Sequence, residues 1–100
     1  MEVEFNDQVY DRLESDRSYT HGFPTPVVSA YRMCLQLLRA AVSEADLTSM
    51  RMLRLLSVGN AADAYSIRLA DGYDLTLELR ARSPRSLVRI RGVVRLKSAQ

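Results

Sequence analysis

Hydrophobic and polar residues repeat with different periods along this chain, and the changes of period mark the predicted elements. Val3 and Phe5 alternate with acidic residues, as in a short half-buried strand. Asn6 or Asp7 can then cap a helix that runs to about Asp16. The buried stripe of this helix is expected to consist of Val9, Tyr10 and Leu13.

A second, longer helix is predicted to begin at Thr25-Pro26, after a turn over residues 17–24. Thr25 would be its N-cap and Pro26 its first residue, where a proline costs no hydrogen bond. Apolar residues then recur at intervals of three and four, which places them on one continuous face toward a core. They are Val27, Tyr31, Cys34, Leu35, Leu38, Ala41, Val42 and Ala45.

In the second half of the chain the period shortens to two, which predicts strands. Residues 50–56 are ambiguous between a helix end and a strand, and we interpret them as a strand. Residues 65–69 and 73–79 each alternate as half-buried strands. Asp71-Gly72 lies between these two segments and indicates a tight hairpin turn with positive φ angles.

A last, long strand is predicted over residues 88–96, after a loop at 82–86. Its alternation places Val88, Ile90, Val94 and Leu96 on the inner side, and Arg89, Arg91 and Arg95 on the outer side. Gly92 interrupts the alternation and indicates a bulge or bend.

These elements predict an α+β fold that forms a single domain over residues 1–100. Short connections favour antiparallel neighbours, so two N-terminal helices should pack on the apolar face of a twisted antiparallel sheet. The pleat then assigns a set of arginines to the uncovered face. They are Arg68, Arg80, Arg89, Arg91 and Arg95.

Charge is distributed unevenly between the two halves. The formal net charge is +2, but residues 1–50 carry −4 and residues 51–100 carry +6. Thirteen of the fourteen basic residues are arginine, whose planar guanidinium matches phosphate and carboxylate groups. A nucleic-acid surface is one interpretation. A solvated sheet face or a surface for an acidic protein are the alternatives, and no motif for reading DNA sequence is present.

Composition excludes several other classes. No apolar run approaches the roughly 18 residues of a spanning helix, and the N-terminus lacks signal-peptide features, so we expect a cytoplasmic protein. Cys34 is the only cysteine and His21 the only histidine, which rules out an intrachain disulfide and a structural zinc site. Cys34 is interpreted as a core residue and His21 as a loop residue, with acid or base chemistry the less favoured role for His21. No cofactor motif is present, and no metal is expected.

The tyrosines are expected to contribute mainly to packing. Tyr10 and Tyr31 are predicted in the core, whereas Tyr65 and Tyr73 should face inward from strands with hydroxyls at the rim of the sheet.

The order strand, two helices, sheet, together with the segment Tyr65-Ser66-Ile67-Arg68-Leu69-Ala70-Asp71, resembles the RelE/ParE superfamily of bacterial toxins and is most similar to its HigB branch. Further similarity lies in Tyr19-Thr20-His21-Gly22-Phe23, Tyr31-Arg32-Met33 and Arg39-Ala40-Ala41. The resemblance covers nearly the whole chain, although its motifs are short.

This resemblance implies the toxin of a type II toxin–antitoxin system, with a HigA-like helix-turn-helix antitoxin as partner. Active members are metal-independent endoribonucleases that cut messenger RNA, commonly on the ribosome. It also implies that Arg68 stabilises the phosphate, with Arg54 as a second basic residue. Lys97 would act as a base or phosphate clamp, or else be a solvated tail residue. The RNA-binding set would comprise Arg68, Arg80, Arg89, Arg91, Arg95 and Lys97.

Three departures from the HigB pattern concern catalysis. The loop at residues 57–62 lacks the basic residues of the branch, and Asp74 follows Tyr73 where an arginine is expected. The chain ends at residues 94–100 without the usual Asp-Tyr-His. Ribonuclease activity is therefore expected to be weakened or lost. The alternatives are an inactive RelE-fold module that binds RNA or an antitoxin, and the gyrase poisoning of the ParE branch, which no feature here supports.

Overall fold

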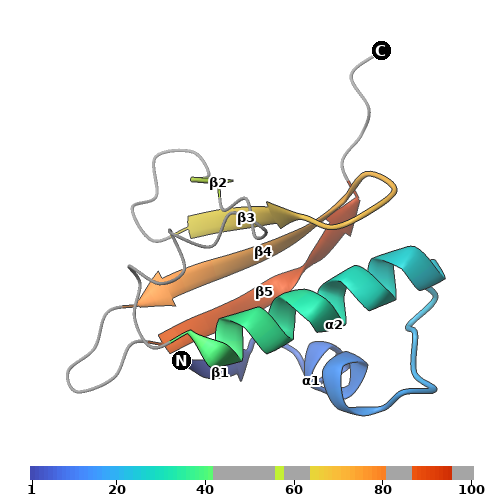
Figure 1. Ribbon diagram of the computed structural model, residues 1–100, viewed down its shortest axis with the longest axis horizontal. Helices are drawn as coiled ribbons and strands as arrows, with labels where there is room; N and C mark the ends of the chain where they lie inside the picture. Colours follow the sequence, from blue (N-terminus) through green and yellow to red (C-terminus); the bar gives the residue numbers. More distant parts are fainter. Residues whose placement is uncertain (42–55, 58–63, 81–86, 96–100) are drawn as a thin grey trace.

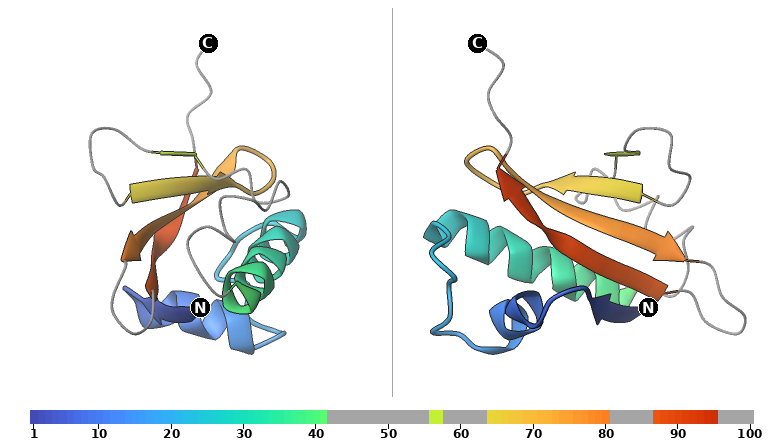
Figure 2. Two further views of the ribbon diagram at one scale, coloured as in Figure 1. Left: turned by 60° about the vertical axis from the view of Figure 1, so that its left-hand side comes forward. Right: turned by 180° about the vertical axis from the view of Figure 1, so that it is seen from behind.

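Two helices lie on one side of a sheet, so the described parts of the chain form two layers (Figure 1, Figure 2). This computed structural model describes residues 1–41, 56–57, 64–80 and 87–95. The elements are β1 (Glu2–Phe5), α1 (Gln8–Ser15), α2 (Thr25–Ala40), β2 (Leu56–Ser57), β3 (Ala64–Arg68), β4 (Tyr73–Arg80) and β5 (Leu87–Arg95). The predicted α+β class with two N-terminal helices is confirmed. Within the described ranges, no helix is both long and apolar enough to cross a bilayer.

The strands lie in the order β1-β5-β4-β3-β2. The pairs β2–β3, β3–β4 and β4–β5 are antiparallel, as predicted, but β1 pairs with β5 in parallel. The predicted wholly antiparallel sheet is therefore wrong at this edge. The reason is that β1 is not joined to its neighbour by a hairpin, because both helices intervene before the chain reaches β5, and a long crossover suits a parallel pair.

The core lies between α2 and one face of the sheet, which we call the inner face. Buried side chains of the two helices are Leu13, Val27, Val28, Tyr31, Cys34, Leu35 and Leu38. They pack with Ile67, Leu75, Leu77, Leu79, Val88, Ile90 and Val93 from the strands. The opposite side, which we call the outer face, carries Glu2, Glu4, Ser66, Arg68, Asp74, Thr76, Glu78, Arg80, Leu87, Arg89, Arg91 and Val94.

The helix boundaries agree with the predictions at one end and differ at others. Asp7 is the N-cap of α1, and its carboxylate accepts a hydrogen bond from the Val9 amide at 3.0 Å. The N-cap of α2 is Pro24 rather than Thr25, because the Pro24 carbonyl accepts the first helical hydrogen bonds. The helix ends at Ala40, where Ala41 turns extended with ψ 140°, so the predicted continuation through Ala41 is wrong.

Other predicted boundaries lie outside the described residues. These are positions 42–45 of the longer helix, positions 50–55 of the first strand of the second half, the loop at 82–86 and Leu96.

The hairpin between β3 and β4 has the geometry that its sequence predicts. Asp71 and Gly72 have φ angles of 51° and 79°, both in the left-handed region. The turn is closed by hydrogen bonds from the Leu69 amide to the Tyr73 carbonyl and from the Tyr73 amide to the Ala70 carbonyl, both 2.9 Å.

A bulge in β5 changes which residues face outward. Leu77 pairs with Ile90 but Thr76 pairs with Gly92, so Arg91 is an extra residue without a partner on β4. The bulge predicted from Gly92 is confirmed, but its effect on the alternation was not anticipated. Val93 is buried on the inner face, and Val94 is 43% exposed. Arg95 pairs with Tyr73 on the inner side, so its predicted outer position is wrong.

The close approach of Tyr10 to Gly92 gives a test of this bulge. A Cβ atom at Gly92 would lie 2.9 Å from the Tyr10 hydroxyl and 3.2 Å from Cζ. We expect Gly92→Ala to lower the free energy of unfolding by about 1–3 kcal/mol because the ring must shift. Urea denaturation of Gly92→Ala, Tyr10→Phe and the double variant should show partial rescue, since Tyr10→Phe removes the nearer atom. A fully additive double-mutant cycle would contradict the contact.

Candidate nucleic-acid interface

Four of the arginines predicted to contact nucleic acid lie on the outer face, with Arg68 near one end of β4 and the other three near the other end. Arg68 ends β3, Arg80 ends β4, and Arg89 and Arg91 lie on β5. Arg95 lies on the other side of the sheet, near the Tyr73 ring. Arg54 and Lys97 fall outside the described residues. The structure therefore gathers three members of the predicted set around Glu78, places Arg68 on the same face at the other end of β4, and places Arg95 on the opposite side.

Carboxylates lie between these arginines. Glu78 pairs with Arg80 at 3.1 Å and with Arg91 at 3.4 Å, so one carboxylate on β4 joins two guanidinium groups. Asp74 pairs with Arg68 at 3.5 Å. The Arg68 side chain stays 66% exposed in this pair, whereas Asp74 is 9% exposed. Arg68 is therefore anchored at one edge of its guanidinium and open to solvent elsewhere.

The outer face is less basic than the predicted set of arginines implied. Glu2 and Glu4 of β1 share the face with Arg89, to which Glu4 is paired in the register. Four arginines and four carboxylates thus occupy its described part, which carries no formal net charge. Alternation directs polar strand residues outward regardless of the sign of their charge, and Asp74 and Glu78 are among them.

Asp74 forms the most buried polar contact on the outer face. Ser66 donates a hydrogen bond from its hydroxyl to Asp74 Oδ2 at 3.0 Å, and Asp74 Oδ1 is buried without a hydrogen bond. A buried carboxylate oxygen without a donor is costly, which leaves the nearby Arg68 Nε as its main electrostatic support. Arg89 Nε is likewise buried without a partner, so Arg89 offers less of its guanidinium to a ligand than Arg68 does.

Two candidate reactive groups belong to the core, as predicted. Cys34 is buried, and burial raises the pKa of its thiol to about 11, which keeps it protonated and unreactive near neutral pH. Tyr31 is fully buried and donates from its hydroxyl to the Tyr10 carbonyl at 2.8 Å. Burial raises the pKa of Tyr31 far above its usual value. Neither group is available for proton transfer.

The described residues include no group of three or more His, Cys, Asp or Glu side chains placed to hold a metal ion.

No protein-family model matches this sequence, and no curated protein matches it.

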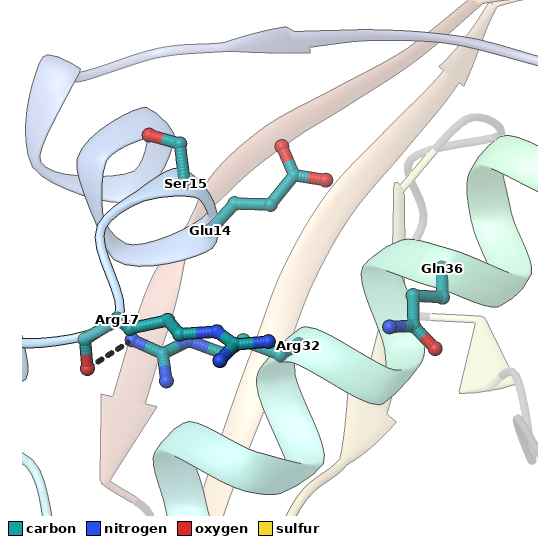
Figure 3. Close-up of a pocket in the computed structure, with 5 residues that line it drawn as sticks. All are labelled: Glu14, Ser15, Arg17, Arg32 and Gln36. Atoms are coloured by element: carbon teal, nitrogen blue, oxygen red, sulfur yellow. Dashed lines mark hydrogen bonds between the residues drawn. The ribbon is translucent and has the colours of Figure 1, made fainter.

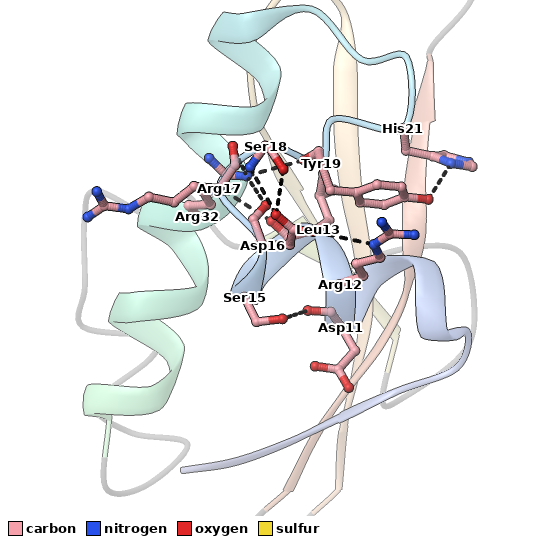
Figure 4. A network of polar contacts seen from close by, with 10 residues as sticks. All are labelled: Asp11, Arg12, Leu13, Ser15, Asp16, Arg17, Ser18, Tyr19, His21 and Arg32. Carbon is pink, nitrogen blue, oxygen red and sulfur yellow. Dashed lines mark hydrogen bonds and ion pairs between the residues drawn. The ribbon is translucent and has the colours of Figure 1, made fainter.

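A surface pocket between α1 and α2 is lined by Glu14, Ser15, Arg17, Arg32 and Gln36, and the side chains of Glu14, Ser15 and Arg32 have structural partners (Figure 3). Arg32 donates to the carbonyls of Leu13, Asp16, Arg17 and Tyr19 at 2.9–3.3 Å and thereby caps the C-terminal end of α1 (Figure 4). Glu14 accepts two hydrogen bonds from Arg39, at 2.6 and 2.7 Å. Arg32 and Arg39 of α2 therefore hold α1 and the loop after it in place at this pocket.

Sequence reasoning missed one cluster that this loop carries. Tyr19, His21 and Phe23 lie in a segment that we interpreted as a turn and as part of the family resemblance, but not as a cluster of rings. The available signal was the presence of three rings in one short segment, and their spacing alone does not place them on one side, because His21 and Gly22 have left-handed φ angles in a turn. Their contact with Tyr73, which is distant in the sequence, could not be predicted from a local pattern.

Glu78→Gln tests whether the carboxylates restrain the arginines of the outer face. The change frees Arg80 and Arg91, so we expect short single-stranded RNA to bind about three- to tenfold more tightly at low salt, measured by fluorescence anisotropy. Glu4→Gln removes the same charge from an exposed position on this face and is the matched control. An equal gain in both variants would attribute the effect to net charge and contradict the release of two arginines.

Arg32→Met tests the cap on α1, because methionine keeps an apolar stem and removes the donors. Four carbonyls lose a charged donor, so the free energy of unfolding should fall by roughly 2–3 kcal/mol in urea denaturation. Arg17→Met, at an exposed position of the loop after α1, is the control and should change the free energy of unfolding by less than about 0.5 kcal/mol. Equal effects of the two changes would show that the cap contributes little.

Proposed function

We propose that this chain is the toxin of a type II toxin–antitoxin system, a HigB-like messenger RNA interferase with weakened catalysis that acts in the cytoplasm with a helix-turn-helix antitoxin as partner. The observation that carries the proposal is the position of Arg68. It is the residue that matches the strand arginine of the family, and its guanidinium is 66% exposed on the face that the helices leave uncovered.

The proposed reaction needs no metal ion. The 2′-oxygen of the RNA attacks the adjacent phosphorus while the bond from phosphorus to the 5′-oxygen breaks. A base takes the 2′ proton, an acid supplies a proton to the 5′-oxygen, and the products carry a 2′,3′-cyclic phosphate and a 5′-hydroxyl. Arg68 would contribute fixed positive charge to the transition state. Arg54 and Lys97, which lie outside the described residues, are the other proposed catalytic groups.

A second candidate function is a non-catalytic module of the same fold that holds RNA or an acidic antitoxin on the outer face. The observation that favours it is the pairing of Arg68 with Asp74, together with the two arginines bound to Glu78. A face whose cations already have carboxylate partners suits exchange of those partners for an acidic protein segment better than it suits strong phosphate stabilisation.

Induction of the protein alone in bacteria tests the first function, with growth and transcript 5′ ends as the measurements. We expect slowed growth and new 5′-hydroxyl ends that require translation. Unchanged growth with intact messages would remove the ribonuclease proposal, and steeply salt-dependent RNA binding without turnover would then support the second candidate.

Arg68→Ala links this activity to the outer face. We expect cleavage to fall by at least about tenfold because the phosphate loses its cation. Because the Asp74 side chain is only 9% exposed, loss of Arg68 should also lower the free energy of unfolding, by roughly 1–3 kcal/mol, so cleavage is compared at a temperature at which thermal melting shows each variant to be folded. Arg17→Ala, an arginine on the loop between the helices, is the control for charge. Equal cleavage by both variants would contradict the role of Arg68.

A further inference from the structure

Four rings form a continuous row at one end of the sheet, on the side opposite to the outer face. We call Tyr19, His21, Phe23 and Tyr73 the aromatic strip. Adjacent ring centroids lie 5.8 Å apart for Tyr19–His21, 5.7 Å for His21–Phe23 and 5.6 Å for Phe23–Tyr73. The last two contacts are edge-to-face, an arrangement in which one ring leaves its face uncovered by the other.

An arginine lies at each end of the strip. The Arg12 guanidinium is 4.3 Å from the centroid of the Tyr19 ring, and that of Arg95 is 6.0 Å from the centroid of Tyr73. Arg12 also pairs with Asp16 at 3.5 Å, and its side chain remains 63% exposed. Arg95 is exposed as well. The strip is thus a row of four planar rings with one cation at each end, and with these cations it extends across α1, the loop between the helices, β4 and β5.

The loop that supplies three of the rings is held in place before any ligand arrives. Arg32, on α2, donates hydrogen bonds to the carbonyls of Asp16, Arg17 and Tyr19 (Figure 4). His21 and Gly22 have successive left-handed φ angles of 50° and 77°, and the Phe23 amide donates to the Thr20 carbonyl at 2.9 Å. A rigid loop lowers the entropy cost of binding.

His21 is the residue that core packing does not explain. Tyr19, Phe23 and Tyr73 are half-buried and pack against the core, whereas His21 is exposed. Its ring lies at the outer end of the polar network, where Nδ1 is 2.9 Å from the Tyr19 hydroxyl (Figure 4). An exposed imidazole oriented by a hydroxyl and flanked by two rings presents a flat surface to a ligand.

From this geometry we infer that the aromatic strip binds single-stranded RNA by stacking bases on its rings, with Arg12 and Arg95 contacting the flanking phosphates. A row of rings with a cation at each end, in which the imidazole of His21 is exposed, is an arrangement that can hold single strands irrespective of sequence. An acidic protein segment would use the two arginines but would leave the ring faces without a matching partner. This surface is separate from the outer face, and the inference does not require ribonuclease activity.

The test compares two probes, a labelled eight-nucleotide single-stranded RNA and an abasic strand of the same length and charge. We expect the intact full-length protein to bind the RNA about tenfold more tightly than the abasic strand in fluorescence anisotropy, because only the RNA can stack. Equal affinity for both probes, or no binding of the RNA, would overturn the inference.

His21→Asn is the decisive variant. Asparagine tolerates the left-handed backbone angle and keeps a polar group near Tyr19, so the fold should survive, which thermal melting checks. We expect RNA binding to weaken about fivefold or more, with binding of the abasic strand unchanged. Equal RNA affinity of His21→Asn and the unaltered protein would overturn the inference.

Two arginine variants separate this surface from others. Arg17→Gln removes a charge from the same loop at a position that points away from His21, and it should weaken both probes equally and slightly (Figure 4). Arg68→Gln reports on the outer face. If Arg68→Gln weakens RNA binding and His21→Asn does not, the strip is excluded while the proposed function stands. If His21→Asn weakens RNA binding and Arg68→Gln does not, the result supports binding at the strip and shows that Arg68 on the outer face does not contribute to RNA binding.

Discussion

The burial of one face of α2 against β4 and β5 determines where the charged residues of this protein lie. Leu75, Leu77 and Ile90 must face the helix, because exposing these fully buried side chains would cost several kcal/mol of hydrophobic stabilisation, on the order of 2 kcal/mol each, in a small domain with little to spare. Their neighbours are consequently directed to the other side of the sheet. Glu78 and Arg89 lie opposite each other on the outer face for this reason. The residues that form the outer face are thus determined by the residues that the core buries.

The parts of the fold that could be predicted are those with strong local patterns. The apolar face of α2, the alternation of β4 and the Asp71-Gly72 turn each depend on residues close in sequence. The parallel edge strand carried no such signal, because a strand's period does not identify its partner. Gly92 indicated the bulge, but the sequence did not indicate that Arg91 would be the extra residue. The position of the extra residue depends on burying Val93 opposite Leu75, which is a contact between two strands.

The candidate site was predicted less well than the fold, for two reasons. The first is that the bulge places Arg95 on the inner side. The second is that Asp74 and Glu78, which the alternation also directs outward, pair with Arg68, Arg80 and Arg91, and the prediction did not include these ion pairs. Asp74 illustrates the consequence. It occupies the position where the resemblance implies an arginine, so one difference both removes a cation and restrains Arg68, the cation that remains. The aromatic strip depends on a tertiary contact and was not predicted.

The pairing of β1 with β5 has a consequence for how the molecule reaches its native state. Glu2 lies beside Leu87 and Phe5 beside Ile90, so the two paired strands are far apart in the sequence. Closing so long a loop is entropically costly, and contacts this distant in sequence slow folding. The first strand therefore stays unpaired until β5 is in place beside it. Docking of β1 is expected to be a late step in folding.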